Sequence, residues 1–429
     1  MIISQINFKY IFSHRISQNA IANFVRTILQ IIIAFVCNYI IVRLATKQEI
    51  GLWALVFTFS TFLNLIDLGI SQALIRYIAN DETNTHKYFW VSFIFYLISG
   101  TIAIVFLFII YLLFGHLFFK DVSPSAIFII ITLIGTHLSL LTSAFTNILN
   151  GKQLMIKSST IEVFKSIAYY GIILTLFPQI GVISFAYATL GSSLFCLIIS
   201  YFTVKKSTAI PYFSFDLAVF KKLFNFGIKT FGLAIINQLK GAWLPFLIQS
   251  MFGISYVAYT DFLTRIMGYF RQLLLSTVLP LLPAASALHA KNEKTKLKKL
   301  YRLSLPLLFI IGIIACLGLT LTIPYVVNFW LGPDYQPVII ISQILCWAVF
   351  FNLLSGPAVY ILQAMNNQKP VLIFAFVTML LFFAFTFIGG KFYGFNALFI
   401  GNVIAETIAV IYFLAWFKRK KLLDAKSYD

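Results

Sequence analysis

The chain has 429 residues, of which 60% are hydrophobic and only 10% are charged. This composition excludes an ordinary soluble globular protein and indicates an integral membrane protein. The formal net charge of +19 would suit a nucleic-acid-binding protein. We expect no nucleic-acid partner, because no basic run is interleaved with aromatic residues on a soluble module.

Apolar runs follow one another along the whole chain. A helix crosses the bilayer core with about 20 residues, and only helices and closed barrels satisfy every backbone group in lipid. The long unbroken runs favour helices. We therefore predict an all-α membrane protein with twelve transmembrane spans, over residues 20–44, 51–76, 88–114, 125–149, 160–177, 181–204, 226–252, 254–280, 303–327, 337–364, 370–388 and 394–417.

The first 18 residues are too polar to span and lack a signal-peptide pattern, so we expect an uncleaved interfacial segment. Most Lys and Arg residues lie in loops on the N-terminal side of the predicted membrane. The opposite side holds Arg43, Lys47, Lys120 and Lys391. Because cytoplasmic loops collect basic residues, we predict that both termini are cytoplasmic.

A weak internal repeat divides the chain into two halves. Gly394 follows Gly181 by 213 residues, and each glycine opens a similar apolar run. Leu149-Asn150-Gly151 also resembles Met365-Asn366-Asn367. Six spans per half is an even number, so both lobes would enter the membrane in the same direction, as in a parallel repeat. The predicted organisation is a six-helix lobe over 1–206, a cytoplasmic linker over 207–225, a second six-helix lobe over 226–417 and a basic tail over 418–429.

Four spans, the first, second, seventh and eighth, carry polar residues at helical spacing, which places them on one helix face. We predict that these faces line a hydrated cavity. The residues are Asn19, Asn23, Arg26, Gln30 and Cys37 in the first span, Ser60, Asn64, Asp67 and Ser71 in the second, Asn237, Lys240 and Gly241 in the seventh, and Asp261, Arg265, Gly268 and Gln272 in the eighth.

Cations inside the membrane need a reason, since each costs about 2.5 to 3.5 kcal/mol even on a lenient scale. We predict that Arg26, Lys240, Arg265 and Arg271 bind an anionic ligand, with Asn23, Gln30, Asn64, Asn237 and Gln272 as polar lining. Two alternatives stay open: Asp261 and Arg265, four residues apart, could simply neutralise each other, and Arg271 could pack or snorkel. The sequence offers Arg26 and Lys240 only Asp67 as an obvious charged partner.

Asp67 and Asp261 are candidate sites for coupling to H⁺ or Na⁺, because an intramembrane carboxylate can change protonation with its surroundings. Glu406 is a lone buried acid and is better explained as an interhelical hydrogen-bond partner. The four cysteines show no paired spacing, and phosphate-loop and HExxH motifs are absent from the sequence. We therefore expect no cofactor, no metal site and no enzymatic activity.

The segment from Ala290 to Arg302 alternates basic residues with Leu297, Leu300 and Tyr301. Such a pattern is typical of an amphipathic helix on an anionic membrane surface. A merely solvated basic loop is the alternative.

Four stretches resemble the polysaccharide transporters, the lipid-linked oligosaccharide flippases of the multidrug/oligosaccharidyl-lipid/polysaccharide exporter superfamily. They are Gln48-Glu-Ile-Gly51-Leu-Trp53, Asp67-Leu-Gly-Ile-Ser-Gln-Ala-Leu-Ile-Arg76-Tyr-Ile-Ala79, Leu149-Asn150-Gly151-Lys152 and Pro280-Leu-Leu-Pro283. The resemblance implies a bacterial inner-membrane protein whose two six-helix lobes form a V-shaped central cavity, as in MATE transporters. It also implies that spans one, two, seven and eight line this cavity, the set that the polar faces indicate on their own.

The substrate implied by the resemblance is an undecaprenyl diphosphate carrying a short oligosaccharide, flipped by alternating access for O-antigen or capsule synthesis. Membrane lipids, a polysaccharide polymerase and glycosyltransferases are the expected partners. The main alternative is a cation-coupled exporter of drugs or other small molecules from the same superfamily. A transporter of the major facilitator type is disfavoured, because the loop at residues 77–88 lacks that family's Gly, Asp and Arg-rich pattern. A glycan-handling membrane enzyme is the remaining alternative.

Overall fold

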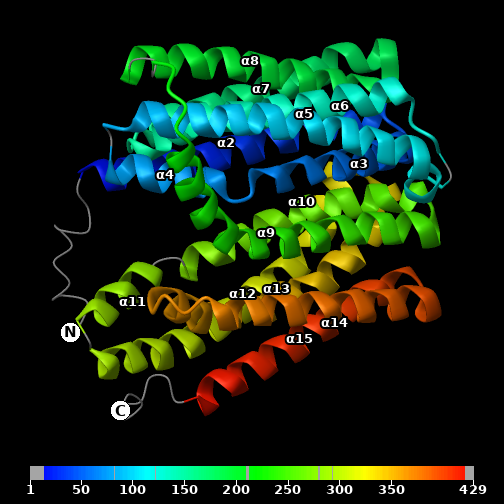
Figure 1. The fold of residues 1–429 in the computed structure, drawn as a ribbon. Coiled ribbons are helices and arrows are strands. Elements are labelled where there is room, and N and C mark those ends of the chain that lie inside the picture. The colour runs from blue at the N-terminus through cyan, green and yellow to red at the C-terminus, as the bar shows by residue number, and fades with distance from the viewer. Residues whose placement is uncertain are drawn as a thin grey trace. The chain divides into compact units, whose positions relative to one another are not determined.

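A computed structural model describes residues 14–81, 83–120, 122–208, 212–278, 281–291 and 293–420. In this part of the chain the secondary structure is helical throughout, as predicted (Figure 1). The contacts divide the chain into two compact units, unit 1 over residues 1–238 and unit 2 over residues 239–429.

Each predicted span is matched by helix, usually longer by several residues at one or both ends. The elements up to the division are α2 (His14–Leu44), α3 (Lys47–Ser60), the 3-10 helix η2 (Thr61–Asp67), α4 (Ile70–Asn80), α5 (Thr85–Phe118), α6 (Ala126–Gly151), α7 (Met155–Ile180), η3 (Gly181–Ile183), α8 (Ser184–Thr208) and α9 (Leu217–Phe252). Those that follow are α10 (Ile254–Val278), α11 (Leu281–Ala290), α12 (Lys294–Trp330), η4 (Pro333–Tyr335), α13 (Gln336–Ala364), α14 (Lys369–Tyr393) and α15 (Phe395–Arg419).

Ten stretches of described residues are long and apolar enough to cross a membrane, and one of them, Met155–Ser207, contains both α7 and α8. Helix α10 is not among the ten. It has a suitable length, but Asp261, Arg265 and Arg271 interrupt its apolar surface. This charge content is what makes α10 a candidate for a functional helix.

The turns between the last helices of the two units are built alike. Gly181 has φ +60° between α7 and α8, and Gly394 has φ +89° between α14 and α15. Gln153, between α6 and α7, has φ +59°, and Asn366, between α13 and α14, has φ +55°. Since glycine and asparagine tolerate the left-handed region best, the predicted match of Gly181 with Gly394 has a structural basis. The second match is better aligned on Gln153 and Asn366, which are also 213 residues apart.

Helix α9 begins within the range expected as a linker. The Asp216 carboxylate accepts hydrogen bonds from the backbone N–H groups of Ala218 at 2.9 Å and Val219 at 3.4 Å. The Ala218 bond is the main reason that the pKa of Asp216 is lowered, and Lys87 adds an ion pair at 3.5 Å. A side chain that caps the first N–H groups of a helix fixes where the helix starts. The contact division, by comparison, falls between Gln238 and Leu239, inside α9.

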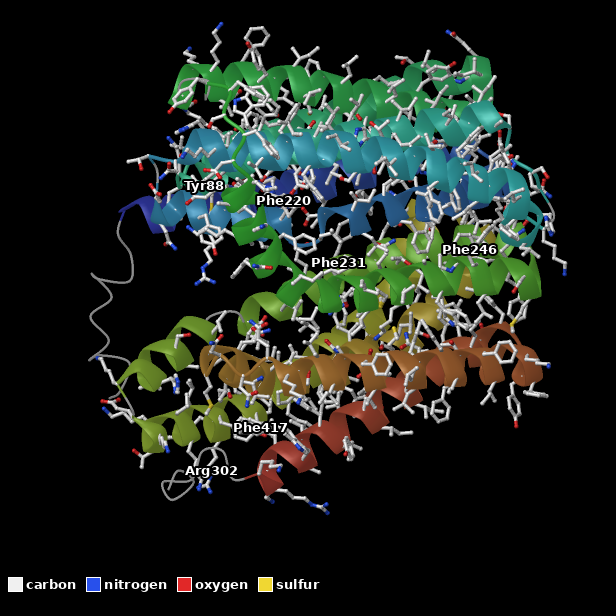
Figure 2. All side chains as sticks on the ribbon, viewed as in Figure 1. Tyr88, Phe220, Phe231, Phe246, Arg302 and Phe417 are labelled. Carbon is white, nitrogen blue, oxygen red and sulfur yellow. The ribbon has the colours of Figure 1, made fainter. Side chains whose placement is uncertain are left out.

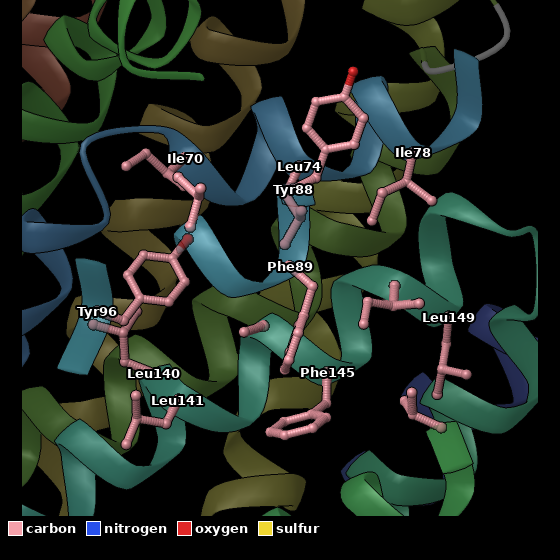
Figure 3. Packing of buried hydrophobic residues seen from close by; sticks show 14 of the residues in the cluster. Ile70, Leu74, Ile78, Tyr88, Phe89, Tyr96, Leu140, Leu141, Phe145 and Leu149 are labelled. Atoms are coloured by element: carbon pink, nitrogen blue, oxygen red, sulfur yellow. The ribbon is translucent and has the colours of Figure 1, made fainter. Parts of the chain in front are cut away.

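A hydrophobic core cluster of unit 1 is formed mainly by α4, α5 and α6 (Figure 3). Side chains such as Leu74, Phe89 and Ile148 are buried completely or almost so. Helices α6 and α8 approach closely, since a Cβ atom on Gly135 would lie 2.7 Å from the backbone nitrogen of Leu190. Small residues at such contacts are typical of membrane helix packing.

The basic segment 290–302 is helical from Lys294 onward, where it forms the first turns of α12. Its apolar side does not remain open for lipid. Leu297 is 2% exposed and packs in a cluster with Ala358, Ile361 and Phe417 of α13 and α15. Tyr301 contacts the Phe417 ring at 5.1 Å, and Arg302 is exposed at this end of unit 2 (Figure 2). From Lys294 onward the segment is therefore an amphipathic helix and not a solvated loop, but its apolar stripe is covered by the protein's own helices.

Candidate functional site

The polar face of α2 is engaged by α7 within unit 1. Asn23 donates to Met155 Sδ at 3.4 Å and accepts from Ser159 Oγ at 3.3 Å. Gln30, two turns later, donates to Ser166 Oγ at 3.2 Å. These two predicted lining residues therefore have partners on a neighbouring helix.

A third amide continues the same series. Asn38, which is buried, donates to Tyr170 Oη at 3.2 Å. The residue numbers of the partners on α7 increase together with those on α2, so the two helices run parallel in a fixed register. Interhelical amide bonds of this kind hold membrane helices together and explain much of the predicted polar stripe without a ligand.

Arg26 lies on α2 between Asn23 and Gln30 and is half-buried. Its Nε atom is buried and has no hydrogen-bond partner among the described residues. Asn19 belongs to the helix, but the structure describes no side chain there. Cys37 is half-buried. Among the side chains of this face that the structure describes, Arg26 thus keeps an unused hydrogen-bond donor at Nε.

The second span is not one continuous helix. It consists of α3, η2 and α4, and two successive left-handed residues, Leu68 at φ +47° and Gly69 at φ +77°, separate η2 from α4. Glycine adopts this conformation freely, whereas Leu68 does so at a cost of roughly 1 to 2 kcal/mol. Broken helices at membrane depth are typical of transporter binding sites.

Asp67 lies at this break and stabilises the start of α4. Its Oδ1 atom accepts hydrogen bonds from Tyr96 Oη at 2.5 Å and from the Ser71 backbone N–H at 2.9 Å. Ser71 Oγ and Tyr96 Oη are 3.0 Å apart. The carboxylate caps the helix, a position where negative charge is favourable.

Helix α9 contacts both ends of the 3-10 segment. Gln238 donates to Thr61 Oγ1 at 2.7 Å, at the beginning of η2. At the other end, a Cβ atom on Gly227 would lie 2.5 Å from the Leu68 carbonyl oxygen, so only glycine fits there. Asn64 in η2 and Asn237 in α9, both predicted lining residues, are exposed.

Lys240 has an acidic partner in unit 2 that the sequence did not reveal. Its Nζ lies 2.8 Å from Glu406 Oε1, and Asn352 donates to Glu406 Oε2 at 3.3 Å. The Lys240 ammonium also lies 5.2 Å from the centre of the Phe382 ring. The expectation that Asp67 would be its only charged partner was wrong, because Glu406 is 166 residues away in sequence and joins it only through the fold. The explanation of Glu406 as an interhelical hydrogen-bond partner is confirmed.

Helix α10 presents a polar face that its own unit leaves largely uncovered. Thr264, Gly268, Arg271 and Gln272 are exposed, and Asp261 and Arg265 are half-buried beside them. The opposite side of the helix is packed, with buried residues Phe262, Leu263, Ile266, Met267 and Phe270. The predicted polar stripe of α10 is therefore a real helix face, and it includes Arg271 at its edge.

Asp261 and Arg265 form the ion pair that was the simpler alternative for them. Arg265 Nε lies 3.0 Å from Asp261 Oδ2, and their side chains are 27% and 20% exposed. This ion pair neutralises only part of the charge of the face, because Arg271, further along α10, is also exposed there. A guanidinium that is paired but still accessible can exchange partners with a phosphate group.

Other polar partners were also missed by sequence reasoning. Trp243 donates to Thr386 Oγ1 at 3.0 Å and stacks on Phe383 at 4.6 Å, which ties α9 to α14.

In the part of the chain that the structure describes, no group of three or more His, Cys, Asp or Glu side chains could hold a metal ion.

Comparison with protein families gives a match over most of the chain. Residues 40–340 match the model of a family described as polysaccharide biosynthesis protein. Comparison with curated proteins gave no match.

Solved structures with the same fold are transporters. An inward-facing multidrug resistance MATE family transporter of the MOP superfamily has a TM-score of 0.80 and 18% identity, over 93% of this chain and 96% of that one. An outward-facing structure of such a transporter gives 0.70 and 18%, over 97% and 96%. A MOP superfamily transporter from Pyrococcus furiosus, described as having a binding pocket of reverse polarity, gives 0.68 and 19%, over 94% and 95%.

At these sequence identities the solved structures show the fold alone, whereas the match to the family model shows the family to which the chain belongs. The described helices have a MATE-like fold, as the sequence predicted, and ten stretches of them are long and apolar enough to cross a membrane, as in a multi-pass membrane protein. The chain belongs to the polysaccharide biosynthesis protein family.

Proposed function

We propose that this protein flips an undecaprenyl-diphosphate-linked oligosaccharide from the cytoplasmic to the external leaflet of a bacterial inner membrane. The product would supply surface polysaccharide such as O-antigen or capsule. Family membership supports a role in polysaccharide synthesis, and the fold supports transport. The Lys and Arg residues of the loops support cytoplasmic termini.

The observation that carries the proposal is the uncovered face of α10. Arg265 lies 11 residues after the start of the helix at Ile254, or about 16 Å along its axis. In a bilayer core of about 30 Å this is near mid-depth. Charged and polar side chains at that depth face water or a ligand rather than acyl chains.

The chemistry of this face suits a diphosphate. Arginine offers planar, bidentate donors that match phosphate oxygens, and its charge cannot be removed by deprotonation. Arg265 and Arg271 supply two guanidinium groups, and Thr264 and Gln272 supply neutral donors and acceptors for phosphate or sugar hydroxyl groups. In unit 1, Arg26 is a further candidate because its buried Nε atom is unsatisfied among the described residues.

The proposed cycle is alternating access, in which substrate is bound from one leaflet and released toward the other. No covalent bond is broken, so the protein's contribution is to lower the cost of moving a polar headgroup through the hydrocarbon layer. If flipping is coupled to H⁺ or Na⁺, Asp67 and Asp261 are the acids we propose for that role, both of which have hydrogen-bonding partners in the structure.

The test is to replace Arg265 and Arg271 together with Gln and to measure surface glycan in cells and flipping of a labelled polyprenyl-diphosphate glycan in proteoliposomes. We expect a loss of about tenfold or more, since hydrogen bonds to charged groups contribute roughly 1.5 to 3 kcal/mol each. Lys296→Gln with Lys299→Gln, on the polar beginning of α12, is the matched control for charge removal. Normal flipping by the α10 variant would contradict the proposal, and drug export in place of flipping would favour a small-molecule exporter.

A further inference from the structure

Lys240 and Glu406 are unequally exposed, although they share one ion pair. The Glu406 side chain is 9% exposed, whereas the Lys240 side chain is 24% exposed. Both carboxylate oxygens of Glu406 have partners, Lys240 on one and Asn352 on the other. The acid is therefore enclosed within unit 2, and the ammonium group lies nearer to accessible space.

The surroundings of Lys240 on α9 are open. Asn237 is exposed, and a Cβ atom on Gly241 would have no neighbour within 4 Å. A ligand could therefore approach the ammonium group without moving the packed side chains around Glu406. Lys240 therefore forms a structural ion pair and is also accessible to a ligand.

Within the described part of unit 2, Lys240 is the cation that forms an ion pair with Glu406. Helix α13 contributes the neutral Asn352, and α14 contributes Phe382 next to the lysine. The charged residues of α14, Lys369 and Lys391, lie near its two ends. Within α15 the other charged residues, Lys418 and Arg419, lie in the last turn. If Lys240 moves away, Glu406 loses its counter-charge.

We propose that Lys240 changes partner when substrate binds: the ammonium group moves to the diphosphate, and Glu406 takes up a proton from water. No covalent bond forms or breaks, and the net gain of the complex is one proton. The physical reason is that an enclosed carboxylate without a cation is strongly disfavoured in its charged form, whereas its neutral form is tolerated. Asn352 can remain hydrogen-bonded to the protonated acid.

This inference rests on the proposed function and adds a specific role to it. Lys240 is a binding residue that becomes available only by leaving Glu406, and Glu406 makes binding of the anion proton-dependent. Binding of a multiply charged headgroup would then leave less net negative charge inside the membrane than the headgroup brings. Less uncompensated charge lowers the electrostatic cost of crossing the hydrocarbon layer.

The experiment is calorimetric titration of the purified full-length protein with geranylgeranyl diphosphate in buffers of different ionisation enthalpy. The dependence of the heat on the buffer gives the number of protons bound. On binding, we expect the wild type to take up about one proton more than Glu406→Gln. The Kd of the wild type should therefore rise with pH more steeply than that of Glu406→Gln, by about a further factor of ten per pH unit. Subtracting the values for Glu406→Gln removes protons that the diphosphate itself binds.

The variants distinguish partner exchange from a purely structural ion pair. Glu406→Gln should bind the probe at least as tightly as the wild type, because Lys240 no longer has to leave an acid. Lys240→Gln should bind about tenfold or more weakly, and Lys240→Arg should restore binding. The doubly neutral Lys240→Gln, Glu406→Gln variant, whose amides can still hydrogen-bond, should bind weakly without extra protons even if a single variant fails to fold.

Equal proton uptake by the wild type and Glu406→Gln would overturn the inference and leave the flippase proposal standing. So would unchanged affinity in a folded Lys240→Gln variant. Absence of any binding of the diphosphate by the wild type would overturn both.

Discussion

Helices α2 and α10 look alike in sequence and differ in the structure. Each carries polar residues at helical spacing, and each includes an arginine among them. In unit 1 the amides of α2 bond to α7, from Asn23 through Asn38. In unit 2 the polar face of α10 stays largely uncovered.

The difference shows that periodicity identifies a face but not what covers it. The stripe of α2 consists mainly of amides, which can donate and accept, so a neighbouring helix with hydroxyl groups satisfies them. The stripe of α10 has arginines, which only donate and which carry full charge. Burying a charged stripe against another helix costs more free energy than burying a stripe of amides. Contact with water or a ligand is therefore favoured for the stripe of α10.

Thiol accessibility should give the largest contrast between the two helices. In a Cys37→Ser background, Gly268→Cys on α10 should react with a membrane-impermeant methanethiosulfonate about a hundredfold faster than Ala34→Cys on α2, since reaction needs a hydrated thiolate. Ala34 is 7% exposed, whereas a Cβ atom on Gly268 has no neighbour within 4 Å. Similar labelling rates, measured by mass spectrometry, would remove the distinction.

Filling the open face should reduce transport without unfolding the protein. We expect Gly268→Phe to lower glycan flipping about tenfold or more, a loss equivalent to roughly 1.4 kcal/mol in the transport barrier, with unchanged thermal stability. Gly318→Phe on α12 is the matched control: its Cβ would also have no neighbour within 4 Å, and apolar residues such as Leu317 and Leu321 are exposed beside it. If both variants lose transport equally, the effect belongs to bulk and not to the α10 face.

The polar face of α2 should matter for stability more than for transport. Gln30→Leu removes the bond to Ser166 and should cost about 1 kcal/mol of unfolding free energy. Ser166 keeps its bond to the Glu162 carbonyl at 3.2 Å, so no hydroxyl is left unpaired. Denaturation in detergent would measure the loss, and flipping at a permissive temperature should be near normal. A complete loss of flipping in a stable variant would return Gln30 to the binding site.

The smallest effect is expected from the Asp261–Arg265 pair. Because both side chains are partly accessible, Asp261→Asn should change the unfolding free energy by only about 0.5 kcal/mol, as for other pairs four residues apart on a helix. The same denaturation assay checks this value. A loss of several kcal/mol would mean that the face is buried in the working protein.

Sequence patterns predicted the spans well because apolar length is a local property. They did not reveal the break after Asp67, since Leu68 has no intrinsic preference for the left-handed region and only Gly69 gave a local signal. They also missed the Lys240–Glu406 pair, which depends on the packing of α9 against α15. The candidate residues were chosen by type and helix face, and they stay a prediction; the neighbours that bond to Asn23, Gln30 and Lys240 come from distant helices and have no signature of their own.

The length of α12 has a consequence for the choice of bilayer. Its first turns are basic and polar, and the part that follows, Leu303 to Trp330, extends about 42 Å, against a hydrocarbon core of about 30 Å. Its first turns are held by Leu297 in the cluster with α13 and α15, so the helix cannot relieve hydrophobic mismatch by sliding on its own. An apolar stretch longer than the hydrocarbon core is accommodated by tilt, by a bend such as one at Pro306 or Pro324, or by thicker lipid, so acyl-chain length should tune the activity of this protein.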